Sequence, residues 1–110
     1  MIHNGGYAKD ELFIKAKALR DQLFYCSHTW SHLDLTENDQ VPVPYPTTYT
    51  EAYNEIMNNH QTATELFGGM TYPTFSTYCM VTPGISGLYN PNAIKALLDA
   101  GILHMNIPRC

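Results

Sequence analysis

The sequence has 110 residues, of which 45% are hydrophobic and 15% are charged, and its formal net charge is −4. This length and balance suit one globular domain and exclude a disordered chain. The sequence has no cluster of Lys and Arg for nucleic acid, and no apolar run approaches the roughly 20 residues of a membrane helix. We therefore expect neither a nucleic-acid partner nor a membrane span. Residues 1–6 show no signal-peptide pattern, and the localisation stays unknown.

The first third of the chain predicts one helix and one strand. Apolar side chains repeat at helical spacing from Lys9 to about Gln22, which predicts an amphipathic helix. Its inward stripe is Leu12, Ala16, Leu19 and Leu23. The apolar segment Leu23–Cys26 follows and predicts a short strand buried on both faces. Cys26 and Cys79 each lie in an apolar run, so we expect both thiols in the core.

The middle of the chain predicts a proline-rich loop and a second helix. Three prolines between Glu37 and Pro46 favour an extended loop. Thr48 and Glu51 form a capping box that opens the helix, and Gly68-Gly69 ends it. Its apolar stripe is Tyr49, Ala52, Tyr53, Ile56, His60, Ala63 and Phe67. Because this face packs on the sheet, we expect His60 to be a packed histidine and not a ligand.

The last third predicts a strand, a loop, a helix and a further strand. The second strand is Tyr78–Val81, again expected to be buried, and a loop with proline and glycines follows it. Asn90-Pro91 predicts a helix start, and Gly101 predicts the helix end. This helix is expected to turn Ile94, Leu97 and Leu98 inward. Ile102–Ile107 then reads as a third strand.

Helices and strands therefore alternate along the chain, which predicts an α/β fold with a parallel sheet and right-handed crossovers. Such folds carry their chemistry in the loops that follow the strands, here Ser27–Pro46 and Thr82–Asn90. Three strands do not close a barrel, so residues 1–110 look like part of a (β/α) barrel domain. Its open sheet edges would need cover from a second copy of the chain or from the missing remainder of the domain.

Two histidines stand where the first predicted strand ends. His28 and His32 are four residues apart, a spacing that on a helical turn puts both imidazoles on one face. Imidazole binds zinc and other divalent metals well, so the pair is a candidate metal site. Thr29 stands where a zincin would carry Glu, which excludes that class of metalloprotease. The alternative is that both histidines are ordinary polar loop residues.

The segment Ser27-His28-Thr29-Trp30-Ser31-His32-Leu33-Asp34-Leu35 resembles the metal-binding motif of the polysaccharide deacetylases, the NodB-homology carbohydrate esterases. The resemblance implies a metal-motif loop at residues 27–36, in which His28 and His32 bind a divalent metal, most commonly zinc. It also implies that Thr29 shapes the loop by hydrogen bonding. Asp34 would be a structural capping residue outside the metal shell.

A second segment extends the resemblance. Val81-Thr82-Pro83-Gly84-Ile85-Ser86-Gly87-Leu88-Tyr89-Asn90 takes the place of the family's Arg-x-Pro-Tyr-Gly motif but lacks its Arg and Tyr. Together with the helix and strand start that follow, it looks like the branch acting on galactosaminogalactan-type exopolysaccharides. The resemblance implies a substrate loop at residues 82–90, with backbone N–H groups near Ile85 to Leu88 stabilising an oxyanion. The implied substrate-binding residues are Pro83, Ser86, Gly87, Leu88 and Tyr89.

Two parts of the family pattern are missing. Nothing before His28 supplies the aspartate pair that gives the catalytic base and the third metal ligand, and no terminal histidine acid is visible. His104 lies inside a predicted strand and does not fit the acid. The resemblance thus implies a fragment or homologue of a metal-dependent hydrolase that removes N-acetyl groups from an amino-sugar polysaccharide, inactive alone. The alternative is a non-catalytic carbohydrate-binding remnant. Members of the parent family are usually secreted or lie at the cell surface.

Overall fold

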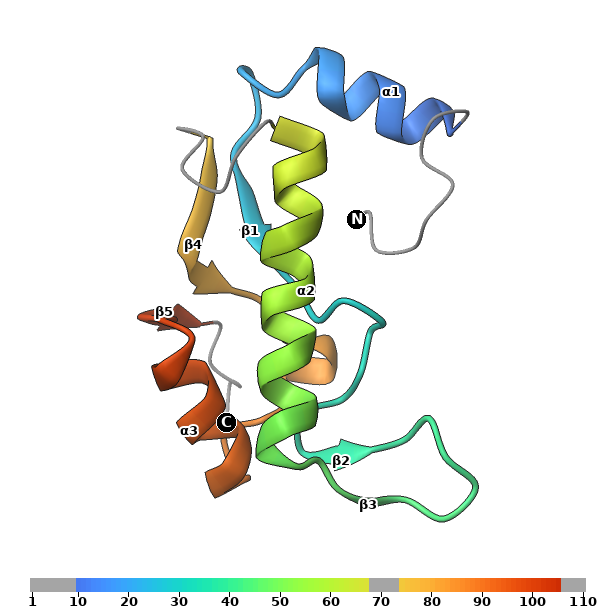
Figure 1. The fold of residues 1–110 in the computed structure, drawn as a ribbon, viewed down its shortest axis with the longest axis vertical. Coiled ribbons are helices and arrows are strands. Elements are labelled where there is room, and N and C mark those ends of the chain that lie inside the picture. The colour runs from blue at the N-terminus through green and yellow to red at the C-terminus, as the bar shows by residue number, and fades with distance from the viewer. Residues whose placement is uncertain (1–9, 68–73, 106–110) are drawn as a thin grey trace.

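The computed structural model describes residues 10–67 and 74–105, which form an α/β fold around a small parallel sheet (Figure 1). The elements in chain order are α1 (Glu11–Ala18), β1 (Tyr25–Ser27), β2 (Glu37–Asn38), β3 (Tyr45–Pro46), α2 (Tyr49–Phe67), β4 (Phe75–Met80), the 3-10 turn η2 (Pro83–Ile85), α3 (Pro91–Asp99) and β5 (His104–Met105). No helix within the described residues is long and apolar enough to cross a membrane.

The main sheet has the strand order β1-β4-β5, and both pairs are parallel. Tyr25 lies opposite Phe75, and Cys79 lies opposite His104. The helices α2 and α3 connect successive strands, so the predicted alternation and the parallel sheet are confirmed. The described residues do not form a closed barrel, and that part of the expectation stays a prediction.

The loop that carries three prolines is a hairpin. Its strands β2 and β3 form a separate antiparallel pair, with Glu37 opposite Pro46 and Asn38 opposite Tyr45. The prediction of a plain loop was therefore wrong in part. The extended path favoured by the prolines is what allows the two short strands to pair. The amide of Asn38 and the hydroxyl of Tyr45 both donate to a carboxylate oxygen of Glu51, at 2.7 and 2.6 Å, which ties the hairpin to α2.

Local sequence signals predicted the starts of α2 and α3 correctly. The hydroxyl of Thr48 accepts the N–H of Glu51 at 3.2 Å, and the Glu51 carboxylate accepts the N–H of Thr48 at 3.0 Å. The side chain of Asn90 accepts the N–H of Asn92 at 3.1 Å, at the start of α3. The expected end of α2 at Gly68-Gly69 lies outside the described residues.

The core lies where α2 and α3 pack against each other and against the end of β4 (Figure 1). The cluster is Leu35, Ala52, Ile56, Met80, Ala93, Ala96, Leu97 and Ile102. Most of the expected stripe of α2 is confirmed, whereas the stripe of α3 was wrong in part. Leu97 is buried, but Ile94 is 37% exposed and Leu98 is 65% exposed. The buried face of α3 consists of Ala93, Ala96 and Leu97.

The first third of the chain is much less buried than its hydrophobicity predicts. The strand begins at Tyr25, and it is not buried on both faces, because Phe24 is 89% exposed and Cys26 is also exposed. Among the described strands, β1 pairs only with β4, so one edge is uncovered. Helix α1 ends at Ala18, and Leu12 and Leu23 remain largely exposed. Between α1, α2 and β1 lies an apolar cavity of about 620 Å³.

Strand β4 also departs from its expected range and burial. It covers Phe75–Met80, and Val81 follows it outside the strand. Only Met80 is fully buried, whereas Tyr78 and Val81 are exposed and Cys79 is half-buried. The expectation that both cysteines belong to the core was therefore wrong. A three-stranded sheet with helices mainly over one face cannot cover both faces of its strands.

Candidate functional site

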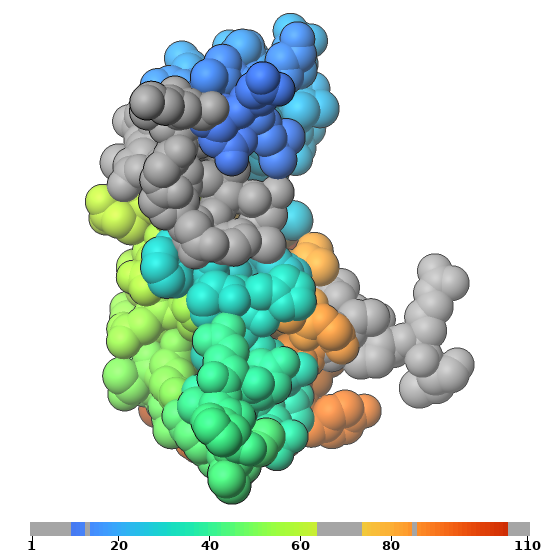
Figure 2. Space-filling model, turned by 90° about the vertical axis from the view of Figure 1, so that its right-hand side faces the viewer, coloured from blue at the N-terminus to red at the C-terminus, as the bar shows by residue number. Residues whose placement is uncertain are grey.

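The loops that follow β1 and β4 meet at the carboxyl ends of the two parallel strands. The N–H of Val81 donates to the carbonyl of Ser27 at 2.9 Å, which carries the pairing past the strand ends. Farther along, the backbone N–H of Leu35 donates to the hydroxyl of Ser86 at 2.9 Å. In Figure 2 the cyan surface of the first loop lies against the orange surface of the second. The two loops in which the sequence placed the chemistry are therefore neighbours in the structure.

The two histidines of the first loop lie side by side. Their ring centroids are 5.0 Å apart, and the rings meet edge to face at 61°. The segment is a turn and not a helix, because the N–H of His32 donates to the carbonyl of Thr29 at 3.2 Å. His32 has a φ of 65°, in the left-handed region that a residue with a Cβ rarely occupies. The helical geometry assumed for the pair was wrong, but a different turn brings the imidazoles together.

The backbone of the second loop orients His28. Its ring Nδ1 lies 2.5 Å from the carbonyl oxygen of Val81. A carbonyl only accepts hydrogen bonds, so Nδ1 carries a proton, and in the neutral imidazole the lone pair is then on Nε2. Metal-binding histidines commonly have one nitrogen fixed in this way while the other binds the ion. His28 is half-buried and His32 is exposed, so the pair lies at the surface.

Thr29 and Asp34 hold the shape of the loop. Thr29 is fully buried, and its hydroxyl donates to the carbonyl of Leu33 at 3.0 Å. The carboxylate of Asp34 accepts the N–H groups of Thr36 and Glu37, at 2.8 and 3.1 Å. These bonds make Asp34 a turn-capping residue, as the family resemblance implied.

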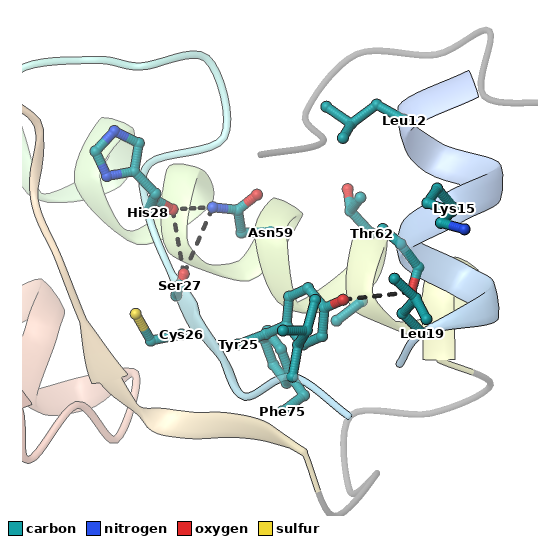
Figure 3. A pocket seen from close by; sticks show the side chains of 13 residues that line it. Leu12, Lys15, Leu19, Tyr25, Cys26, Ser27, His28, Asn59, Thr62 and Phe75 are labelled. Atoms are coloured by element: carbon teal, nitrogen blue, oxygen red, sulfur yellow. Dashed lines mark hydrogen bonds between the residues drawn. The ribbon is translucent and has the colours of Figure 1, made fainter. Parts of the chain in front are cut away.

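Helix α2 supplies two positioning side chains that the sequence reasoning missed. Glu55 is 7% exposed, and its Oε1 accepts the N–H and the hydroxyl of Ser31, at 3.1 and 2.6 Å. One turn later, the side-chain amide of Asn59 donates to the carbonyl of His28 (Figure 3). The sequence did contain a signal for this pair. Glu55 and Asn59 are polar residues four positions apart, and each directly precedes a residue of the inward stripe of α2, Ile56 or His60.

The second loop is largely turned inward. Pro83, Ser86 and Gly87 are buried. The N–H of Ser86 donates to the carbonyl of Pro83 at 3.1 Å, and that of Gly87 donates to the hydroxyl of Thr36 at 3.0 Å. The expectation that backbone N–H groups here face an oxyanion is therefore wrong for these two, because both are hydrogen-bonded within the protein. A substrate role for these residues stays a prediction.

Leu88 and Tyr89 lie at the accessible end of the second loop. Tyr89 is 84% exposed. Both residues line a shallow cavity of about 490 Å³, together with Pro91, Ile94, Lys95, Leu98 and Asp99 of α3. Asp99 pairs with Lys95 at 2.9 Å and accepts the hydroxyl of Tyr49 at 2.8 Å. Hydrogen bonds from Lys95 and Tyr49 lower the pKa of the Asp99 carboxyl, so this surface carries a fixed anion and cation beside an aromatic ring.

The remaining histidine of α2 is packed, as expected. His60 is 3% exposed and meets the ring of Phe75 edge to face, with centroids 6.1 Å apart. Burial lowers the pKa of its imidazole, which favours the neutral form. Among the described residues, no group of three His, Cys, Asp or Glu side chains is arranged to hold a metal ion. The two imidazoles of His28 and His32 are a donor pair whose chemistry fits zinc.

Comparisons with known proteins identify the family of the chain. The model of the Agd3 deacetylase domain family matches residues 6–106 of the chain. The chain is also similar to a solved crystal structure described as Agd3, a novel carbohydrate deacetylase, with 28% identity and a TM-score of 0.68 over 87% of this chain. The chain spans 13% of the length of that protein. No protein of the curated set matches. Because the family model matches nearly the whole sequence, this chain belongs to the Agd3 deacetylase domain family.

Proposed function

We propose that this chain is part of a metal-dependent carbohydrate deacetylase domain, in which His28 and His32 supply two ligands to a divalent metal, zinc. The observation that carries the proposal is the orientation of the pair. Their rings are 5.0 Å apart, and the Val81 carbonyl fixes the tautomer of His28 that has its lone pair on Nε2. Two histidines that only packed or capped the loop would need neither adjacent rings nor a fixed tautomer of His28.

The reaction class follows from the family and from the ligands. A zinc ion held by two imidazoles would polarise an amide carbonyl and lower the pKa of a bound water. The residues of this chain would then act by positioning. Val81 orients His28, Thr29 and Asp34 hold the loop, and Tyr89 offers an exposed aromatic face for the apolar side of a sugar ring. The proposed substrate is an N-acetylated amino-sugar polysaccharide.

The site needs more groups than the described residues supply. Catalytic zinc sites usually have three protein ligands and a water, and amide hydrolysis also needs a base and an acid. We propose that these groups belong to the remainder of a barrel domain, of which this chain would form one part. The 110-residue chain alone would then bind metal weakly and show little or no deacetylation. Robust turnover of an acetylated amino-sugar polymer by this chain alone would contradict that statement.

A second candidate is a carbohydrate-binding remnant without chemistry. The exposed Tyr89 and the cavity beside α3 favour it, because aromatic rings next to fixed charges suit sugar faces and hydroxyls. The two candidates differ in whether His28 and His32 bind a metal. In a binding remnant, Tyr89→Ala weakens oligosaccharide binding while His28→Ala has no effect on metal content.

The test of the main proposal is equilibrium dialysis of the purified protein against zinc, which measures bound zinc while free zinc is still present, as weak binding requires. We expect His28→Ala and His32→Ala to lose most of the zinc retained by the unchanged protein. The matched control is His104→Ala, because His104 is exposed on β5, which β4 separates from β1. Equal zinc content in all four proteins would remove the metal site.

A further inference from the structure

Helix α2 contacts the metal-motif loop at two points, one beside each histidine. Glu55 binds Ser31, the residue before His32, and Asn59 binds the carbonyl of His28 itself. Glu55 and Asn59 are four residues apart, so one turn of α2 separates them on a single helix face. Helix α2 therefore presents two polar groups, one turn apart, to the turn that carries His28 and His32.

The contact at Glu55 is not incidental packing. A buried carboxylate loses hydration and needs compensating hydrogen bonds. Within residues 10–67 and 74–105, no Lys or Arg side chain forms a salt bridge with Glu55. The compensation comes from Ser31, whose N–H and hydroxyl both donate to the same carboxylate oxygen. Hydrogen bonds to an ionised acceptor are shorter and stronger than neutral ones.

Ser31 is held from a second direction as well. The side-chain amide of Gln40 donates to the carbonyl of Ser31 at 2.9 Å and to its hydroxyl at 3.0 Å. Ser31 is thus fixed through its N–H, its carbonyl and its hydroxyl. The next residue is His32, with its left-handed φ of 65°. A residue with a Cβ keeps such a conformation only when its surroundings impose it.

Resting on the proposed function, we infer that Glu55 and Asn59 are positioning residues that hold the His28–His32 pair in its metal-ready geometry before any metal binds. Glu55 fixes the turn that carries His32, and Asn59 fixes the backbone of His28, whose ring is oriented by Val81. Neither residue is a metal ligand. Their effect is to remove the cost of ordering the turn when the ion arrives.

The experiment compares Glu55→Ala and Glu55→Gln with the unchanged 110-residue protein. Gln keeps an oxygen that can accept both bonds from Ser31, whereas Ala removes it. The matched control is Asn54→Ala, because Asn54 is the exposed neighbour on α2. Circular dichroism confirms that each variant is folded. The two readouts are zinc affinity by competition with a coloured chelator, and the ring-to-ring nuclear Overhauser effect between His28 and His32 in metal-free protein.

We expect Glu55→Ala to weaken zinc binding by about tenfold or more, the usual effect of removing a group that orients a ligand, and to lose the ring-to-ring signal. Glu55→Gln should stay within about threefold of the unchanged protein and keep the signal. Asn59→Ala, compared with exposed Asn58→Ala, should weaken zinc binding in the same way. A Glu55→Ala protein that keeps both the affinity and the ring-to-ring signal would overturn the inference, as would a Glu55→Gln protein as impaired as Glu55→Ala.

The two readouts separate this inference from the proposed function. If the unchanged protein binds no zinc, the proposed function fails, and the metal-free ring-to-ring signal still decides the inference. Its loss in Glu55→Ala then supports positioning by α2, and its persistence refutes it.

Discussion

The two ends of this molecule differ in how completely they bury their apolar side chains. Around α2, α3 and the end of β4, Leu35 and Ile56 are fully buried. Around α1 and β1, Leu12 is 62% exposed and Phe24 is 89% exposed, although apolar side chains are frequent from Leu12 to Cys26. The difference shows that the end with α2 and α3 has its own core. The end with α1 and β1 has a hydrophobic surface with an open cavity, and β1 has an edge without a partner among the described strands.

The candidate metal turn lies between these two ends. Its bonds to α2 and to the second loop belong to the well-packed end, through Glu55, Asn59 and Val81. On the other side, His28 lines the open cavity together with Tyr25 and Leu19 (Figure 3). The histidine pair is therefore supported from one side, and we propose that the remainder of the domain completes the site from the other.

The largest expected effect contrasts one core residue with one exposed residue. Ile56→Ala should lower the free energy of unfolding by about 2–5 kcal/mol, because it leaves a cavity in a packed region. Leu12→Ala should change it by less than about 0.5 kcal/mol, because the side chain is already mostly exposed. Urea unfolding followed by circular dichroism measures both. Equal losses would show that α1 is packed as tightly as the core, against the comparison drawn above.

A smaller effect contrasts two glycines with positive φ. Gly87 has a φ of 101°, and a Cβ there would lie 3.0 Å from the Cβ of Leu35. Gly101 has a φ of 86°, and a Cβ there would meet nothing within 4 Å. Gly101→Ala should therefore cost about 1–2 kcal/mol from its backbone conformation alone. Gly87→Ala adds overpacking of about 1–3 kcal/mol to the same backbone cost. Thermal unfolding in which the Gly101 variant is the less stable would contradict the close approach of the two loops.

The smallest effect is the pH dependence due to His60. Burial lowers its pKa in the folded protein below the ordinary value of 6.5, so the unfolded chain binds a proton more readily. Its contribution to stability is then fully present above about pH 6.5 and is lost as the pH falls toward the folded pKa. Between pH 7.5 and 5.5, unfolding experiments should show a smaller loss of stability in His60→Phe than in the unchanged protein. An identical slope in both proteins would place His60 in contact with water.

The sequence could predict the features that depend on local chemistry. The capping box at Thr48 and the cap at Asn90 involve residues close together in the chain, and alternation of helices and strands implies the parallel sheet. The position of the candidate site followed in the same way, because parallel strands bring their carboxyl ends to one edge.

Burial and the supporting contacts could not be predicted in the same way, because they depend on residues far apart in the chain. The exposure of Phe24 and Cys26 depends on which face of the sheet the helices cover, and the helices lie mainly over one face. The role of Glu55 depends on a residue 24 positions earlier. The left-handed φ of His32 is imposed by such contacts, so its spacing from His28 suggested a helix where the protein has a turn.

The most direct test of the central claim is a long-range proton–nitrogen spectrum of the histidine side chains during a zinc titration. Metal-free His28 should be the tautomer protonated at Nδ1, as its bond to the Val81 carbonyl requires. Added zinc should then shift the Nε2 signal of His28 and the ring signals of His32, while His104 stays unchanged. A His28 protonated at Nε2, or zinc shifts at His104 without shifts at His28 and His32, would contradict the account.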